Sequence, residues 1–515
     1  MRTRRLTALI VALVFAGGLT LRIWMACGQA GTLDSDMAVL GLMARNVQDG
    51  QFEVFHWGQF YGGAQETYLA ALFGLIGGVH THTLYITTIF LSACVAILIG
   101  LVANELYGKR TGWLSAGLFW LWPAPFVWWA TKIGSNYWYA LVVALGTCLV
   151  LLQLRKGNRT TPRLLLLGFL LGQCLWANPQ SGYVLVPALI YCAAALLKLR
   201  MRLIYVAVAG VVSSLPWWVV FVMTKGMPLK PPGDELDAWP DGLLTTIKYT
   251  LPMVLSFRVP GSGDWVGGPA FGVIGCLVVI AGIAIAMIRA KDKPMFAFLA
   301  FLGSLLLFVT QQWSLFGVQP RYLLWFSPWL VILVAALLIK TPRKQFSTIT
   351  FALACAAFLA GTAALSSINL AMLNNTDRIL QLGPDKFVPK DDSDLIALLH
   401  ENNSKYFYGD YWLAYRVTFE TNGKLVGSPD YTPRWEPFEK AVAASGNPPH
   451  VFMAGSKMID QFQTYCAEQQ MTCEVKTKGD FALMNTSRLL TEQEVTSKFL
   501  KLKRLQPLQS RPYNF

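Results

Sequence analysis

Five carboxylates stand close together just after the first hydrophobic segment of the chain. They are Asp34, Asp36, Asp49, Glu53 and Glu66, and they lie between two apolar runs. Carboxylates are costly inside lipid, and a connecting loop does not need so many of them to stay in water. The cluster therefore indicates a functional site at one membrane surface. General acid–base chemistry on a hydroxyl is what a carboxylate can supply there.

Asp36 is the first candidate for the base of such a reaction, with Asp34 behind it. Both residues, with Ser35, also precede a segment with a helical pattern, and Ser and Asp are preferred residues at a helix N-cap. From position alone, capping is the favoured interpretation. Asp34-x-Asp36 would also suit a divalent metal ion, because hard cations bind carboxylate oxygens, but two carboxylates are a weak metal pattern. No other cofactor is expected.

The same stretch resembles a known family. Asp36 to Arg45, then Gly58-Gln59-x-Tyr61-x-Gly63 and Glu66, is similar to the first external loop of bacterial GT-C glycosyltransferases, the set related to protein O-mannosyltransferases and lipid A aminoarabinose transferases. The segment 409–419 resembles the periplasmic domain of that set. In the family the loop opens with an acidic pair, one member of which is the catalytic base. Met37 replaces the second member here, so the resemblance favours Asp36 as the base, with Asp34 before it.

The resemblance also implies which residues bind substrate. Gln59, Tyr61 and Glu66 match the family loop, although Glu66 could instead be a solvated carboxylate at a helix start. Arg321-Tyr322 resembles the family's Arg-Tyr at the outer start of a span, where an arginine suits a phosphate group or serves as an interfacial anchor.

Three further external cations, Lys132, Lys225 and Arg258, could share the phosphate-binding role. The sequence does not rank these three cations.

Composition predicts an α-helical polytopic membrane protein, because 54% of the 515 residues are hydrophobic and only 14% are charged. A span needs about 20 apolar residues. Eleven segments meet that rule, the first being an expected uncleaved signal-anchor. They are 6–26, 83–103, 112–130, 137–154, 164–178, 182–198, 203–223, 270–289, 294–312, 321–340 and 346–366. The resemblance implies that they form a GT-C fold.

Basic clusters on alternate connections predict the orientation, since Lys and Arg favour the cytoplasmic side. The clusters begin at Arg2, Lys109, Arg155, Lys198, Arg289 and Lys340. They place the N-terminus in the cytoplasm. They also account for the net charge of +14, so that the charge gives no support to a nucleic-acid partner.

The chain divides into two predicted domains. Residues 1–366 form the transmembrane domain, with two long external loops at 27–82 and 224–266. Residues 367–515 have the composition of a soluble domain, and the alternation of short strand and helix patterns predicts a periplasmic α/β domain. Cys466 and Cys473 in this domain would suit a disulfide if it is periplasmic, and the sequence leaves the pairing open.

Together these features predict a glycosyltransferase of a bacterial inner membrane. The proposed site faces outward, where nucleotide sugars are not made. The resemblance implies a polyprenyl-phosphate-linked sugar as the donor, with undecaprenyl phosphate as the carrier in bacteria, and this donor would reach the site through the lipid bilayer. The acceptor would be a glycan such as lipopolysaccharide, a lipid or a protein of the cell envelope, and the transfer would invert the anomeric centre. A membrane transporter or lipid flippase is the alternative, although such proteins usually show internal repeats and broken helices. An assembly subunit with a partner-binding domain is a third hypothesis.

Overall fold

The structure, a computed structural model, describes most of the chain. The described residues are 2–134, 136–229, 239–290, 292–340, 348–375, 380–383, 386–388, 391–429 and 433–490. They form two compact units. The first unit holds residues 1–27, 60–66 and 85–374, and the second holds 28–59, 67–84 and the chain from 375 onward.

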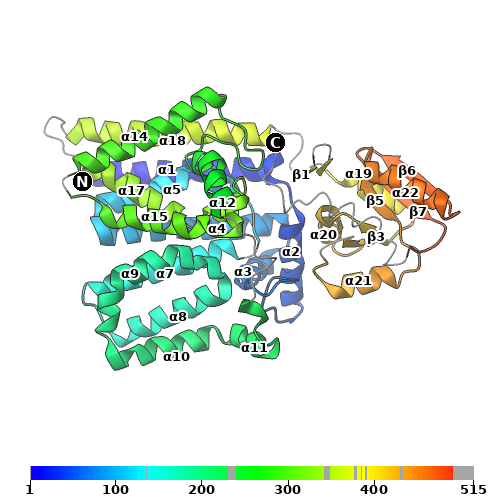
Figure 1. Cartoon of the computed structure of the whole chain (residues 1–515), viewed down its shortest axis with the longest axis horizontal. Coiled ribbons are helices and arrows are strands. Elements are labelled where there is room, and N and C mark those ends of the chain that lie inside the picture. Colours follow the sequence, from blue (N-terminus) through cyan, green and yellow to red (C-terminus); the bar gives the residue numbers. More distant parts are fainter. Residues whose placement is uncertain are drawn as a thin grey trace. The chain divides into compact units, whose positions relative to one another are not determined.

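The described part contains six helical segments that are long and apolar enough to cross a membrane. Figure 1 shows that the chain is mostly helical. The six segments lie in α1 (Arg2–Cys27), α4 (Thr81–Tyr107), α7 (Tyr137–Arg155), α14 (Pro269–Arg289) and α18 (Thr348–Asn374), and in Pro179–Leu197, which joins a short 3₁₀ turn to α9 (Gly182–Leu197). A pair of shorter helices, α10 (Leu203–Ser213) and α11 (Leu215–Met223), would make a seventh span, bent by 66°. The chain is therefore a membrane protein, as predicted.

The predicted number of eleven spans is not confirmed. The segment 112–130 is split between α5 (Lys109–Leu121) and α6 (Ala124–Trp129), because Pro123 lacks the N–H that a continuous helix needs. Pro216 stands in the first turn of α11, directly after the bend. The predicted span 346–366 instead belongs to a helix that continues to Asn374.

Three more of the predicted spans form helices of fewer than 18 residues. These are α8 (Thr161–Ala177), α15 (Met295–Val309) and α17 (Ser327–Lys340). Each is shorter than the roughly 20 residues that a straight span requires.

Close backbone contact joins α8 to α10. A Cβ atom on Gly172 would lie 2.2 Å from the carbonyl oxygen of Gly210, and one on Gly168 would lie 2.2 Å from the carbonyl oxygen of Val206. Gly168 and Gly172 are four residues apart and so share one helix face. Small residues at this spacing let helices of a membrane protein approach closely.

A buried arginine connects three helices of the first unit. Arg22 of α1 donates to the carbonyl oxygens of Gly18 at 3.0 Å and Trp120 at 2.8 Å, and to Ser92 Oγ of α4 at 3.3 Å. Its guanidinium carbon lies 3.6 Å from the centroid of the Trp120 ring. These partners replace water around a charge inside a span, which would otherwise be costly.

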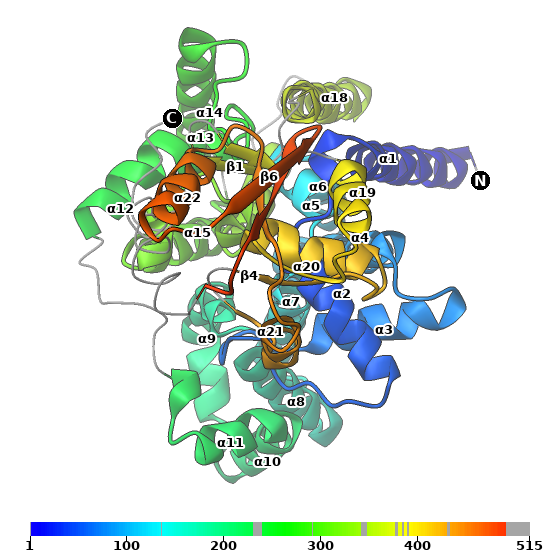
Figure 2. The same ribbon diagram turned by 90° about the vertical axis from the view of Figure 1, so that its right-hand side faces the viewer.

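The second unit contains a five-stranded sheet of order β4-β3-β5-β7-β6. Figure 2 labels its two edge strands, β4 and β6. Strands β4, β3 and β5 run parallel, and β7 and β6 add antiparallel neighbours. The strands are β3 (Tyr406–Gly409), β4 (Val426–Pro429), β5 (His450–Met453), β6 (Cys473–Lys478) and β7 (Phe481–Thr486). A separate hairpin pairs β1 (Leu380–Gly383) with β2 (Lys386–Val388). The predicted small α/β domain is confirmed.

Helices cover both faces of this sheet, as parallel strands require. On one face, Val451 of β5 and Leu483 of β7 share a core with α19 (Ser393–Glu401) and α20 (Tyr411–Glu420). On the other face, the next residues, Phe452 and Met484, share a core with α22 (Lys457–Glu468). The period of two along each strand thus builds two separate cores.

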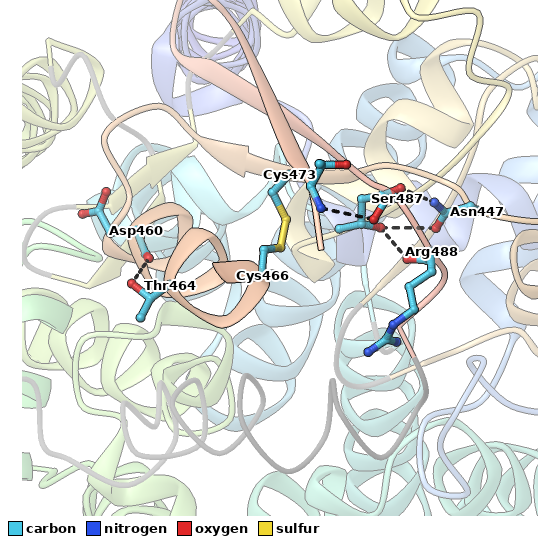
Figure 3. The surroundings of a disulfide bond; sticks show 9 residues. Asn447, Asp460, Thr464, Cys466, Cys473, Ser487 and Arg488 are labelled. Atoms are coloured by element: carbon cyan, nitrogen blue, oxygen red, sulfur yellow. Dashed lines mark hydrogen bonds between the residues drawn. A yellow bond between two sulfur atoms is a disulfide. The ribbon is translucent and has the colours of Figure 1, made fainter. Parts of the chain in front are cut away.

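Cys466 and Cys473 form a disulfide, the pairing that the sequence left open (Figure 3). The bond joins the last turn of α22 to the first residue of β6. It closes a short loop at the edge of the sheet.

Candidate active site

The two aspartates at the start of helix α2 (Ser35–Gln48) have different partners. Asp34 is the N-cap, because its Oδ1 accepts a hydrogen bond of 3.0 Å from the backbone N–H of Met37. Asp36 stands in the first turn, where its Oδ1 accepts a hydrogen bond of 2.6 Å from the hydroxyl of Tyr411. Asp34 therefore caps the helix, and Asp36 is not needed for capping. A catalytic role for either aspartate stays a prediction.

Helix α2 packs along its length against α20 of the C-terminal sheet domain, within the second unit. At its start, Ser35 Oγ donates to the carbonyl oxygen of Tyr411 at 2.5 Å. In its middle, a Cβ atom on Gly41 would lie 2.3 Å from the ring of Phe419. Near its end, Arg45 stacks 4.0 Å from the centroid of that ring and donates to the Phe419 carbonyl oxygen at 2.9 Å. These contacts fix the position of Asp36 against the C-terminal domain.

His56 and Arg434 stand near Asp36 in the same unit. His56 is buried, and burial lowers the pKa of its imidazole to about 4, with the charge of Arg434 acting in the same direction and that of Asp36 opposing it. His56 is therefore neutral at neutral pH. The guanidinium of Arg434 lies 5.5 Å from the centroid of the Tyr411 ring. Asp36 is thus accompanied by a phenol, a neutral imidazole and a cation.

The imidazole of His56 is poorly satisfied. Its Nδ1 lies 3.5 Å from the carbonyl oxygen of Trp57, a long contact, and its buried Nε2 has no hydrogen-bond partner among the described residues. Buried polar atoms without partners are rare in folded proteins.

The remainder of the acidic loop is held by aromatic residues. Glu53 accepts a hydrogen bond of 3.0 Å from Trp57 Nε1, and the Trp57 ring stacks on that of Trp435 with centroids 4.1 Å apart. Burial raises the pKa of the Glu53 carboxyl, and the hydrogen bonds from Trp57 and Asn46 oppose this shift. Glu53 thus has a structural role in positioning the loop.

Glu66 lies in the first unit and caps a membrane helix. Its Oε1 accepts hydrogen bonds from the backbone N–H groups of Trp138 at 2.8 Å and Tyr139 at 3.0 Å, in the first turn of α7. Its own N–H donates to Asn136 Oδ1 at 2.9 Å. Burial raises the pKa of Glu66 to about 7, against the effect of the backbone hydrogen bonds. Its buried Oε2 has no partner within the described part of the chain, and its predicted contact with substrate stays a prediction.

Arg321 and Tyr322 belong to an aromatic group near the start of α7. The guanidinium of Arg321 lies 4.9 Å from the centroid of the Tyr322 ring. Tyr322 stacks on Trp313 at 5.1 Å and meets Tyr137 edge-on at 6.2 Å. Because Tyr137 begins the helix that Glu66 caps, the structure brings Glu66, Arg321 and Tyr322 to one region of the first unit.

Of the other three predicted cations, Lys225 is exposed, whereas Lys132 and Arg258 are buried. Lys132 is buried in the turn between α6 and α7. Arg258 lies between two rings, 4.6 Å from the centroid of Tyr249 and 3.8 Å from that of Trp265, and donates to the carbonyl oxygen of Gly263. Burial lowers the pKa of Arg258, opposed by the nearby acidic groups.

The predicted site residues are distributed over both units. Asp34, Asp36 and the half-buried Gln59 belong to the second unit. The first unit holds Glu66, the half-buried Tyr61, Arg321, Tyr322, Lys132 and Arg258.

The two carboxylates of the Asp34-x-Asp36 pattern each have a hydrogen-bond partner in the structure. No group of three or more His, Cys, Asp and Glu side chains that could hold a metal ion occurs among the described residues. The Asp34 side chain caps α2, and Asp36 accepts from a phenol.

Three neighbours of Asp36 were not predicted from the sequence. Tyr411 lies within a segment that resembles the family, but nothing in the sequence pairs it with a residue 375 positions earlier. Arg434 carries no signal at all. His56 could have been noted, because it is a histidine within the carboxylate loop.

Comparison with known proteins relates the chain to solved structures. No family model matches the sequence, and no curated protein matches it. The apo structure of ArnT from Cupriavidus metallidurans matches with a TM-score of 0.60 and 13% identity, over 93% of this chain and 98% of that one. The structure of ArnT bound to undecaprenyl phosphate matches with a TM-score of 0.57 and 13% identity, over 92% and 97%. The structure of the oligosaccharyltransferase AglB from Archaeoglobus fulgidus matches with a TM-score of 0.49 and 12% identity, over 94% of this chain and 75% of that one.

At 13% identity the match concerns the fold, which is that of ArnT over nearly the whole of both chains. The resemblance to GT-C glycosyltransferases, first seen in the acidic loop, is therefore confirmed at the level of the fold.

Proposed function

We propose that the protein is a glycosyltransferase that moves a sugar from a polyprenyl-phosphate-linked donor to an acceptor outside the cytoplasm. The observation that carries this proposal is the fold match to ArnT, which was solved with undecaprenyl phosphate and is covered over 97% of its length. A fold alone does not determine function, so the acidic loop supplies the second support. Its family-like residues include Asp36, which stands at the start of a firmly packed helix.

Asp36 is the proposed base. Its carboxylate takes the proton from an acceptor hydroxyl, the hydroxyl oxygen attacks the anomeric carbon, and the bond from that carbon to the phosphate oxygen breaks. The polyprenyl phosphate leaves with the electron pair of that bond, and attack from the opposite side inverts the anomeric centre. A positioned base typically contributes about 10²- to 10⁴-fold to such a reaction.

The departing phosphate needs positive charge, and the sugar needs hydrogen-bonding groups. We assign the phosphate to Arg321, supported by Tyr322, with Lys132 and Arg258 as further cations. Tyr61, Gln59 and Glu66 are assigned to the sugar. The unpartnered Oε2 of Glu66 supports this assignment, because a buried carboxylate oxygen is costly without a donor and a sugar hydroxyl would supply one.

We place the protein in a bacterial inner membrane, with its N-terminus in the cytoplasm and residues 367–515 in the periplasm. The alternating basic clusters support the orientation. The Cys466–Cys473 disulfide fits an oxidising compartment. The acceptor would be a glycan, a lipid or a protein of the cell envelope.

The test is transfer from defined donors. Purified protein in proteoliposomes would receive a panel of radiolabelled undecaprenyl-phosphate sugars and a membrane extract as acceptor. We expect one donor to yield labelled product, with an anomeric configuration opposite to that of the donor by NMR. Absence of transfer from every donor by folded protein would contradict the proposal and favour the transporter or flippase hypothesis.

A further inference from the structure

The hydrogen bond from Tyr411 to Asp36 joins the proposed base to the C-terminal sheet domain. At 2.6 Å it has the length of a strong hydrogen bond to a charged acceptor. Both residues belong to the second unit, so the contact lies within one compact body.

The phenol is held firmly in place. Tyr411 is the first residue of α20, and Asp410 caps that helix by accepting from the N–H of Trp412 at 3.0 Å. The Tyr411 carbonyl oxygen accepts from Ser35, and its ring packs edge-on against Trp412 at 5.0 Å and Tyr415 at 5.6 Å. The hydroxyl therefore cannot leave Asp36 without disturbing the contact between α2 and α20.

The hydroxyl also remains a donor. Burial raises the pKa of Tyr411 well above its usual value, the charge of Asp36 raises it further, and Arg434 opposes the shift. This shift favours the protonated phenol, which is the form that donates to Asp36. Other charged or titratable groups that face Asp36 are His56 from the acidic loop and Arg434 from the segment before α21 (Glu436–Ala443), while Asp34 precedes it on its own helix.

We infer that Tyr411 is a positioning residue for the base, supplied by the C-terminal sheet domain. This inference rests on the proposed function. A carboxylate offers about four acceptor positions on two oxygens, and a single phenol uses one of them. The bond can thus fix the orientation of the carboxylate. By donating to the charged form, it also keeps Asp36 ionised at lower pH.

The test is the pH–rate profile of Tyr411→Phe, measured with the donor that the wild type uses. We expect kcat to fall about tenfold with little change in KM, because a less well oriented base slows the chemical step more than binding. We also expect the acid limb of the profile to move up by about one pH unit, because the ionised carboxylate has lost a donor.

Tyr415→Phe is the matched control. It removes a hydroxyl from the same helix. That hydroxyl accepts hydrogen bonds from the backbone N–H groups of Arg434 at 2.6 Å and Trp435 at 3.3 Å, and it donates to Glu439 at 3.3 Å. This variant should lose stability, seen as a lower Tm, without moving the acid limb. A shift in both variants would mean that loosened packing is the cause and would overturn the inference.

A second variant covers the case in which Tyr411→Phe does not fold. Fluorotyrosine at position 411 keeps the shape of the ring and makes the phenol a stronger donor, so the acid limb should move to lower pH. An unchanged profile in folded Tyr411→Phe or fluorotyrosine protein would overturn the positioning role. If Asp36→Asn were still inactive, the proposed function would survive. Full activity of Asp36→Asn would instead contradict the proposed function itself.

Discussion

The hydroxyl of Tyr411 donates to Oδ1 of Asp36 at 2.6 Å, and these two residues are 375 positions apart in the sequence. The bond lies within the second compact unit, which contains both helix α2 and the C-terminal sheet domain. Changes at the contact between α2 and α20 should alter the chemistry of the loop as well as stability.

Gly41 tests how tightly α2 packs on α20. We expect Gly41→Ala to destabilise the protein by about 1–3 kcal/mol, because its Cβ atom would lie 2.3 Å from the Phe419 ring. Alanine is the better helix former by about 1 kcal/mol, so without the clash the change would stabilise. Gly282→Ala in α14, where nothing lies within 4 Å of the new atom, is the control and should not lower the Tm in detergent. An unchanged Tm for Gly41→Ala would contradict the packing of the two helices.

Glu66 should make stability fall as the pH rises. Its pKa is about 7 in the folded protein, against 4.5 as the ordinary value, so the folded state holds a proton more tightly than the unfolded state. The contribution of Glu66 to the free energy of unfolding is therefore greatest below about pH 4.5. It decreases as the pH rises through 7, by on the order of 3 kcal/mol. Gln at this position resembles the protonated acid. We expect Glu66→Gln to match the wild-type Tm at pH 5 and to exceed it at pH 8; equal Tm values at both would contradict the buried carboxylate.

His56 should act in the opposite direction. Its pKa is lowered to about 4, so the contribution of this group to stability is complete above pH 6.5 and is lost as the pH falls toward 4. Between pH 7 and pH 4.5, the Tm of His56→Gln should fall less than the Tm of the wild type. The exposed His400→Gln in the same unit is the control and should follow the wild type. A His56→Gln protein as acid-sensitive as the wild type would show that the imidazole is not buried.

The Cys466–Cys473 bond predicts a response to reductant. Closing so short a loop contributes about 2–3 kcal/mol in the chain-entropy model. Dithiothreitol should therefore lower the Tm of the wild type, while a Cys466→Ser and Cys473→Ser protein should start lower and not respond. Alkylation before and after reduction checks the bond directly. Both thiols reacting without reduction, in protein isolated from cells, would contradict the disulfide and the periplasmic location.

Local patterns were enough to predict many elements. Asp34 before a segment with a helical pattern predicted helix α2, and the alternation of short strand and helix patterns predicted the sheet domain after residue 366. The count of spans could not be obtained in this way, because average hydropathy takes no account of a single proline. Pro123 and Pro216 each stand at a break within a predicted span.

The partners of the site residues could not be predicted from local sequence patterns. Glu66 is an acidic residue at the start of an apolar segment, and only the packed structure shows that it caps a different helix, α7. The contact of Asp36 with Tyr411 likewise depends on how α2 packs against α20. A single sequence contains no record of such distant pairs.

The central claim is that Asp36 is the base, and the most direct test is the rate of sugar transfer by Asp36→Asn beside Asp34→Asn at equal expression and equal Tm. Asn can still cap a helix, so Asp34→Asn should keep α2 folded and lose at most a few-fold in rate. We predict that Asp36→Asn loses at least about a hundredfold, because the base is removed while its shape is kept. Full activity of Asp36→Asn, or an equal loss in Asp34→Asn, would contradict the assignment.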